Sequence, residues 1–469
     1  MFFMSEETKE LKKMLFNEKK NGYDFFDEDE LETCYDFCEG YKGFLAENKT
    51  EREFAQSVLE LAQGEKFVEF DKFGAPLQPG EKVYYFNRGK SIILCVKGRR
   101  PVSEGVRISA AHIDSPRLDL KQCPVYEQEG VGYFKTHYYG GIKKYQWTAL
   151  PLSLHGKICK ADGSEITVKI GEEPSEPKFC ITDILPHLCG EQMARKTNEI
   201  VKGEELNVLI GSRPFKDDDE SERIKLYLLK LLNDKYGIVE QDFLSAELEL
   251  VPALSVDDIG FDRSMIGGYG HDDKVCSYPA MQAIFSIEGA PEYTAITVLT
   301  DKEETGSDGN TGLRSSYLKY FIEDLARLEG CEGRDVLSNS KCLSADVNAA
   351  YDPTWSFAYE KNNASFINKG VCVTKFTGAR GKGDTSDASA EYCGWVRRLL
   401  DQNHVLWQTG ELGKVDGGGG GTVAMYIANM DVDTIDVGVP VLSMHAPYEV
   451  VSKIDVYSAY KAFLTFFTK

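Results

Sequence analysis

Five short segments of this sequence each end in an imidazole or a carboxylate, and this pattern constrains the fold more than any other feature. The segments are VRISAAHID with His112 and Asp114, GGYGHDD with Asp272 and Asp273, AITVLTDKEE with Glu303 and Glu304, KCLSAD with Asp346, and VPVLSMH with His445. Open α/β sheets place their chemistry where strands end. The pattern therefore predicts a sheet whose strand ends bring these side chains together.

The order of strand and helix signals predicts two domains, as expected for 469 residues. Helical spacing covers residues 5–65, strand signals follow up to His112, and strand–helix alternation resumes near residue 258. The intervening residues are richer in β-like pieces and turns. We expect an α/β domain, residues 1–116 and 258–469, with a mostly parallel central sheet flanked by helices. A β-rich domain, residues 117–257, interrupts it.

Composition excludes several classes of partner. The net charge of −21 argues against nucleic acid and anionic membranes as partners. The apolar runs are too short to span a membrane. The first residues, MFFMSEETKELKK, do not resemble a signal peptide, and the twelve cysteines include no CxxC pair. These features predict a cytosolic protein. The acidic run at 215–223 is interpreted as a solvated loop.

The adjacent pair Glu303 and Glu304 indicates a specific chemistry. One carboxylate can bind a metal while its neighbour takes a proton from water, although such pairs are also common on solvated helix faces. Histidine and carboxylate ligands without thiolates suit zinc, cobalt or manganese. In an extended strand, His112 and Asp114 point to one side, so that Asp114 can orient the imidazole.

The HDDK segment leaves alternatives open. Asp272 or Asp273 could bridge two metals, and either could instead cap a helix. His271 is a rival ligand. Cys276 is interpreted as a small apolar helix residue.

The two remaining candidate ligands, Asp346 and His445, are indicated by the sequence to different degrees. Asp346 could equally be a turn residue before a strand. His445 follows a long apolar strand and lies near Glu449 in the sequence.

The glycine run at 417–421 does not match a nucleotide-binding loop because no Gly-Lys-Ser/Thr ending follows it. Two readings remain: a backbone that approaches a substrate closely, including Gly421, or a flexible loop. A GxSxG nucleophile motif in a strand–turn–helix setting is also missing from the sequence.

Taken together and in order, AHIDSPRLDL, HDDK, DKEETGS, SADV and PVLSMHAPYE resemble the aspartyl and vacuolar aminopeptidases, a family of two-metal exopeptidases. The resemblance covers most of the chain. It implies a zinc-exopeptidase-like fold, an inserted dimerisation domain, and dimers that assemble into a dodecamer.

The resemblance also implies residue roles. Two divalent ions per subunit, zinc with cobalt or manganese as alternatives, would be held by His112 with Asp346 and by Glu304 with His445, bridged by Asp272. Glu303 would be the general base and Asp114 the carboxylate that orients the histidine. The CITDILPHLCGEQ segment resembles the stretch whose histidine enters the neighbouring subunit's site, which makes His187 a candidate acting in trans.

The sequence therefore predicts a metallo-aminopeptidase that removes N-terminal residues from peptides. A preference for acidic N-terminal residues would need a positive group, for which Lys382 and Lys414 are candidates. The alternatives are a deacylase or carboxypeptidase with the same ligands, and a non-catalytic self-assembling scaffold.

Overall fold

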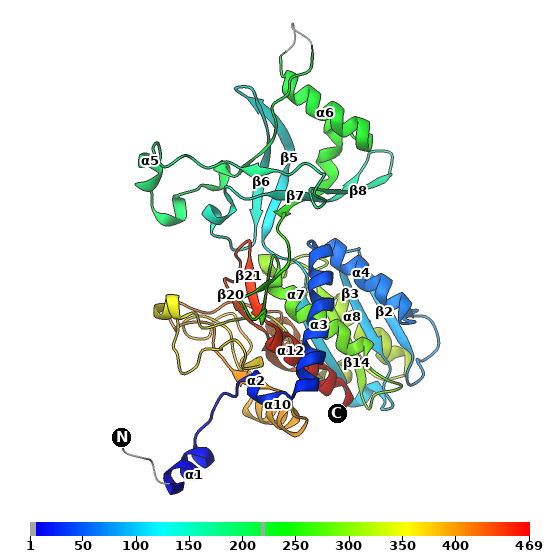
Figure 1. Cartoon of the computed structure of the whole chain (residues 1–469). Helices are drawn as coiled ribbons and strands as arrows, with labels where there is room; N and C mark the ends of the chain where they lie inside the picture. Colours follow the sequence, from blue (N-terminus) through cyan, green and yellow to red (C-terminus); the bar gives the residue numbers. More distant parts are fainter. Residues whose placement is uncertain (1–5, 217–220) are drawn as a thin grey trace.

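The computed structural model describes residues 6–216 and 221–469, so the first five residues and part of the acidic run at 215–223 lie outside it. Within the described residues, nine strands form the central sheet of the body (Figure 1). Their spatial order is β1 (Val68–Glu69), β2 (Lys82–Asn87), β3 (Ser91–Val96), β14 (Thr294–Thr300), β4 (Val106–His112), β15 (Lys341–Ser344), β19 (Asp433–Gly438), β17 (Val371–Thr374) and β18 (Trp407–Thr409).

The middle of this sheet is parallel. Strands β14, β4, β15 and β19 pair in parallel, so their carboxyl ends meet at one edge. Strand β3 pairs antiparallel with β2 and β14, and β17 pairs antiparallel with β19. The sheet as a whole is mixed.

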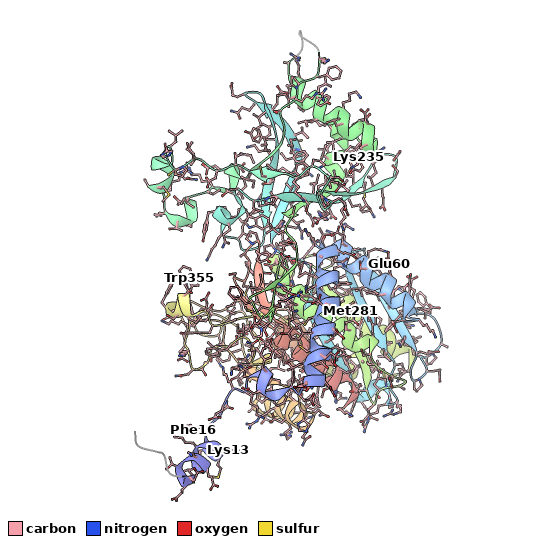
Figure 2. The ribbon with its side chains drawn as sticks, in the orientation of Figure 1. Lys13, Phe16, Glu60, Lys235, Met281 and Trp355 are labelled. Atoms are coloured by element: carbon pink, nitrogen blue, oxygen red, sulfur yellow. The ribbon has the colours of Figure 1, made fainter. Side chains whose placement is uncertain are left out.

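Alternating side chains give the sheet two apolar faces. In β3, Ile92 and Leu94 face one core, whereas Ile93 and Cys95 face the other. Helices α3 (Glu28–Glu47), α4 (Glu51–Gly64), α7 (His271–Phe285), α10 (Ala390–Gln402) and α12 (Lys453–Thr468) contribute to the first core. Helices α8 (Tyr317–Leu328), α9 (Gly333–Ser338) and α11 (Ala424–Ala428) contribute to the second. Figure 2 places Met281 of α7 inside the body.

A second sheet stands above the body in Figure 1, and all its strand pairs are antiparallel. In the described chain its order is β8 (Glu165–Ile170), β7 (Leu152–Cys159), β11 (Ala246–Pro252), β5 (Arg117–Gln128), β6 (Val131–Tyr139), β10 (Asn207–Gly211) and β9 (Cys180–Ile181). Helices α5 (Gly190–Met193) and α6 (Arg223–Tyr236) accompany it. A separate apolar cluster around Trp147 and Phe243 forms its core. We call residues 117–252 the insertion.

A third, smaller sheet lies between the body and the insertion (Figure 1). Among described residues its order is β12 (Asp257–Ile259), β13 (Met265–Gly268), β21 (Glu449–Ser452), β20 (Pro440–Leu442) and β16 (Asn348–Ala349). Strand β13 leads into α7, and the turn between β20 and β21 carries His445. This sheet therefore positions two of the predicted ligands.

The N-terminal segment projects from the body. Helix α1 (Glu6–Leu15) has no buried residue within its described length, and it lies apart from the body in Figure 1. Figure 2 places Lys13 and Phe16 on this projection. A short helix, α2 (Gly22–Phe25), then joins the body by packing against Ile454 of α12.

Among the described residues, no helix combines the length and apolar character needed to cross a membrane.

Candidate metal centre

The carboxyl edge of the parallel strands brings the predicted ligands together. Strand β4 ends at His112, whose register partner is Thr300 at the end of β14. Glu303 and Glu304 follow in a short 3-10 turn, Glu303–Thr305. Asp346 follows β15, and Asp272 lies at the start of α7. Parallel pairing makes these ends coincide, as the sequence pattern predicted.

Asp272 lies between the two histidines. Its Oδ1 is 3.1 Å from Nε2 of His112, and its Oδ2 is 3.1 Å from Nε2 of His445. On the His112 side, Asp346 Oδ1 and Glu303 Oε2 lie 3.7 and 3.9 Å from the same nitrogen. On the other side, Glu304 Oε2 is 3.6 Å from Nε2 of His445. We call these six residues the ligand cluster: His112, Asp272, Glu303, Glu304, Asp346 and His445.

The donor set fits divalent metal ions. His112 Nε2, Asp272 Oδ1 and Glu304 Oε1 are buried and make no hydrogen bond within the described structure, a costly state for polar atoms. Ligand atoms of these three residues lie within 4.8 Å of one another, as do atoms of His112, Asp273 and Asp346. Imidazole and carboxylate donors without thiolate suit zinc and similar ions.

The charges in the cluster favour the binding of cations. Burial raises the pKa of Glu303 and Glu304 well above the ordinary value, and the nearby Asp346 and Asp272 carboxylates raise these pKa values further. Burial alone would lower the pKa of His445, but Asp272 and Glu304 raise it to about 11. Packed carboxylates of this kind are stabilised by positive charge.

Asp114 supports the cluster by contacts with His112 and with the backbone of the two glutamates. Its backbone carbonyl lies 3.0 Å from Nδ1 of His112, and its Oδ1 lies 3.3 Å from the same nitrogen. A carbonyl only accepts, so Nδ1 carries the proton and Nε2 is left free to bind a metal. The Asp114 carboxylate also accepts the backbone N–H groups of Glu303 and Glu304, at 3.1 and 3.2 Å. Burial by itself raises the pKa of Asp114, yet His112, Tyr139 and Arg117 lower it to about 2.

The geometry separates the rival residues in HDDK. Asp272 faces both histidines, whereas Asp273 Oδ2 accepts the backbone N–H of His112, 3.2 Å away. The peptide bond between the two aspartates is cis. His271 lies outside the cluster: its Nδ1 is 2.7 Å from the hydroxyl of Tyr41, and burial lowers its pKa to about 3. Cys276 is fully buried in the core, as predicted.

Glu449 has a role that the sequence did not identify. Its carboxylate accepts the backbone N–H groups of His445, at 2.7 Å, and of Asp272, at 3.1 Å. Its proximity to His445 in SMHAPYE was the available signal.

Four predicted residues lie outside the cluster and form no hydrogen bond to it within the described chain. Lys382 pairs with Asp387 at 2.8 Å. Lys414 is exposed, and its N–H donates to the carbonyl of Ala358. Gly421 is exposed with open space around it. His187 is exposed on the insertion between β9 and α5.

The glycine run packs tightly at its centre. A Cβ on Gly418 would lie 2.0 Å from the carbonyl oxygen of Leu412, and one on Gly419 would lie 2.5 Å from Cα of Ala379. These glycines permit close approach between loop backbones.

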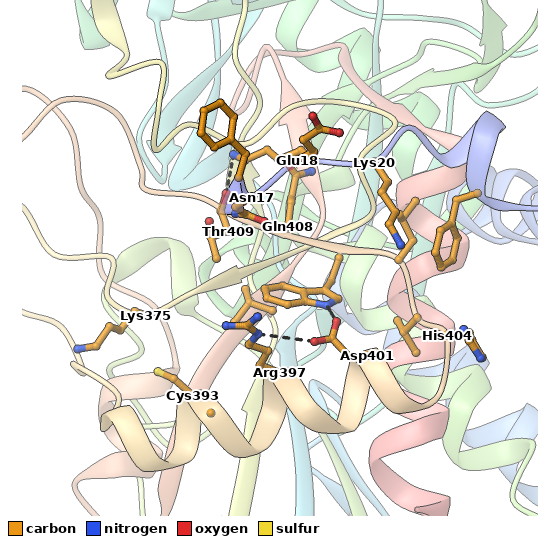
Figure 3. A pocket seen from close by; sticks show the side chains of 18 of the residues that line it. Asn17, Glu18, Lys20, Lys375, Cys393, Arg397, Asp401, His404, Gln408 and Thr409 are labelled. Carbon is orange, nitrogen blue, oxygen red and sulfur yellow. Dashed lines mark hydrogen bonds and ion pairs between the residues drawn. The ribbon is translucent and has the colours of Figure 1, made fainter. Parts of the chain in front are cut away.

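A cavity of about 880 Å³ lies away from this centre, between the N-terminal segment, α10 and β18 (Figure 3). Its polar lining includes Lys20, Arg397, Asp401 and His404, and Arg397 and Asp401 are paired with each other. No member of the ligand cluster lines it. The clustered carboxylates and imidazoles, not cavity size, identify the reactive site.

Comparisons with known proteins identify the family. The family model for aminopeptidase I zinc metalloprotease (M18) matches residues 44–467. The chain is 45% identical over 460 residues to a probable M18 family aminopeptidase 1 of Clostridium acetobutylicum, covering 96% of this chain and 99% of that protein. The crystal structure of an M18 family aminopeptidase from Thermotoga maritima superposes with a TM-score of 0.92 at 40% identity, covering 97% of this chain and 100% of that one. The S. cerevisiae mApe1 dodecamer structure has a TM-score of 0.75 at 21% identity, covering 92% of this chain and 96% of that one, and shows the shared fold alone.

The fold and the site thus define a zinc-dependent exopeptidase acting on peptides. The chain belongs to the M18 family of aminopeptidases, the family of aminopeptidase I.

Proposed function

We propose that this M18 aminopeptidase uses two divalent ions and a glutamate base. His112 and Asp346 would hold one ion, Glu304 and His445 the other, and Asp272 would bridge them. The observation that carries this assignment is that the two carboxylate oxygens of Asp272 each lie 3.1 Å from a different histidine. When bound, such ions polarise a carbonyl and increase the acidity of water.

The proposed base is Glu303. Its carboxylate faces Nε2 of His112, and its backbone is held by Asp114. Its side chain remains 16% exposed, against 3% for Glu304, so water and substrate reach it more readily. Glu303 would take a proton from the attacking water and pass it to the leaving amine.

We further propose that the enzyme favours acidic N-terminal residues, with Lys382 or Lys414 as the positive group and Gly421 beside the substrate. Lys382 is exposed and pairs with Asp387. Hydrolysis of aminoacyl-anilides with acidic, basic and neutral residues tests this preference.

Removal of the metal should abolish activity, and zinc, cobalt or manganese should restore it. Cleavage of N-acetylated peptides in preference to free-amine peptides would instead indicate a deacylase.

We propose that the insertion, which lies within the predicted inserted domain of residues 117–257, is the dimerisation domain. Three large apolar side chains, Ile184, Leu185 and Leu188, are 44–68% exposed beside His187, as expected of a surface covered by another subunit. We propose that His187 enters the partner's site and that dimers assemble into a dodecamer, the state in which S. cerevisiae mApe1 is described. A cytosolic location stays a prediction.

A further inference from the structure

The turn after β6 joins the insertion to the ligand cluster. Strand β6 ends at Tyr139, whose register partner is Arg117, the first residue of β5. Tyr139, Gly140 and Gly141 therefore lie at the root of the insertion, where its first two strands leave the body. All three approach the ligand cluster or Asp114.

Tyr139 acts on Asp114. Its hydroxyl donates to Asp114 Oδ2 at 2.7 Å, the same carboxylate that holds the backbones of Glu303 and Glu304. The tyrosine ring is itself fixed, because the guanidinium of Arg117 lies 3.9 Å from its centroid. The guanidinium of Arg117 is held in turn by two carboxylates.

The anchor of Arg117 is buried. Arg117 pairs with Glu51 at 3.1 Å and with Glu249 at 3.3 Å, and both carboxylates are almost fully buried. Glu51 comes from α4 of the body and Glu249 from β11 of the insertion. The position of the Tyr139 hydroxyl thus depends on how the insertion sits on the body.

The two glycines act on the other histidine. The carbonyl of Gly141 accepts from Nδ1 of His445 at 2.7 Å, which fixes the tautomer that presents Nε2 to Asp272. Gly140 has φ of +77°, and a Cβ there would lie 3.1 Å from Glu304 Oε2. A Cβ on Gly141 would lie 3.3 Å from Nδ1 of His445. At both glycine positions, a side chain would crowd a member of the ligand cluster.

We propose that the Tyr139–Gly141 turn of the insertion positions the metal ligands of the body: Tyr139 through Asp114, and Gly141 directly through His445. The inference rests on the proposed two-metal site. If so, the position of the insertion on the body affects the affinity of the site for metal. Tyr139 is a positioning residue, since its hydroxyl reaches Asp114 and not the reacting atoms.

The test is the zinc affinity of Tyr139→Phe, measured on the full-length protein by competition with a chelator. This variant keeps the ring on Arg117 and removes only the hydroxyl. We expect zinc binding to weaken by about 10–100-fold, the usual effect of losing a residue that supports a metal ligand. The metal-free variant should melt somewhat below the metal-free parent, because a hydrogen bond to a buried carboxylate is lost, and the further rise in Tm on adding zinc should be smaller than in the parent.

Two further variants sharpen the result. Tyr139→Phe added to Asp114→Asn should weaken zinc binding little beyond Asp114→Asn alone, because both act through one carboxylate. Tyr392→Phe is the matched control: it removes a buried phenol that donates to the carbonyl of Cys342, outside the cluster. It should keep the parent's zinc affinity even if it lowers Tm.

The outcomes separate the inference from the function on which it rests. A parent protein that binds no zinc would refute the two-metal site itself. A parent that binds zinc and a folded Tyr139→Phe with affinity within about twofold of it would refute the positioning role alone. If Tyr139→Phe does not fold, Gly141→Ala decides. Its Cβ would lie 3.3 Å from Nδ1 of His445, close enough to shift the ring by a few tenths of an ångström, and unchanged zinc affinity there would overturn the proposal.

Discussion

At the scale of single residues, two adjacent glutamates differ through their surroundings. Glu304 is almost fully buried beside His445 and the Gly140 backbone, whereas Glu303 is partly open beside His112 and Asp346. Identical side chains one residue apart therefore have different roles open to them. The buried one is placed to hold a metal, and the more accessible one is placed to exchange a proton.

Substituting each glutamate by glutamine should separate these roles. Glu303→Gln should retain its zinc and lose kcat by at least about a hundredfold, the usual scale for removal of a general base. Glu304→Gln should instead lose zinc at one position. Steady-state kinetics and metal analysis on both purified variants measure these effects. Equal zinc loss in both, with parental turnover in Glu303→Gln, would contradict the assignment.

Strand-end position was enough to expect His112, Asp114, Glu303 and Glu304 near one another, because parallel pairing makes consecutive strand ends meet. It left Asp346 open, and it did not separate Asp272, at the start of α7, from Asp273 or His271. The choice of Asp272 came from the family resemblance. The same reasoning missed Tyr139 and Gly141. Their contacts depend on the register between β5 and β6 and on how the insertion sits on the body. Neither is encoded in a local pattern, and the only local signal was the YYGG turn itself.

At the scale of elements, the glycine run shows why a sequence pattern left two readings open. Its central glycines are packed against neighbouring backbone, and Gly421 at its end has open space around it. A run of identical residues cannot reveal which members are crowded. The third sheet was missed for a related reason, because strands as short as β16 leave no periodicity to detect.

Alanine should distinguish the crowded from the open glycine. Gly419→Ala would place a Cβ 2.5 Å from backbone atoms at φ of +99°, so we expect a loss of roughly 1–3 kcal/mol in unfolding free energy. Gly421→Ala, the matched control, should change that free energy by less than about 0.5 kcal/mol. Urea unfolding of both variants measures the difference. Equal stability would mean that the loop rearranges without cost.

The contact between α4 and the insertion predicts a pH dependence of stability. In β7, His155 lies 2.7 Å from Glu53 of α4 and 2.8 Å from Glu172. Burial alone lowers the pKa of His155, but Glu172 and Glu53 raise it above the ordinary value of 6.5. Burial raises the pKa of Glu172, yet His155 and Lys49 lower it to about 2, so that this carboxylate stays charged near neutral pH.

A histidine whose pKa is raised in the folded protein stabilises the fold at pH values below its pKa in the unfolded chain. This stabilisation is lost as pH rises through its pKa in the folded protein. The stability advantage of the parent over His155→Gln should therefore be full at pH 6 and shrink as pH increases above about 6.5. Urea unfolding of both proteins from pH 6 to 9 measures it. An advantage that grows with pH would show that His155 is neutral in the folded protein.

At the scale of the whole molecule, two separate parts of the insertion bear on the proposed mechanism. Its root supports the ligand cluster within the same subunit, through Tyr139 and Gly141. Its exposed segment around His187 lies on a different part of the insertion, between β9 and α5. One domain would then align the ligands of its own subunit and complete the site of the partner. Catalysis would require both the correct seating of the insertion and the assembled dimer.

This arrangement predicts complementation between two inactive variants. If His187 stabilises the developing oxyanion in the partner's site, His187→Ala should be nearly inactive with its zinc intact. Glu303→Gln should be inactive for a different reason, the loss of the base. After dissociation, mixing and reassembly, some dimers pair an intact Glu303 in one subunit with an intact His187 from the other. We expect these mixed dimers to recover part of the parental activity. With subunit exchange confirmed by differently tagged chains, a mixture as inactive as either variant alone would place His187 outside the partner's site.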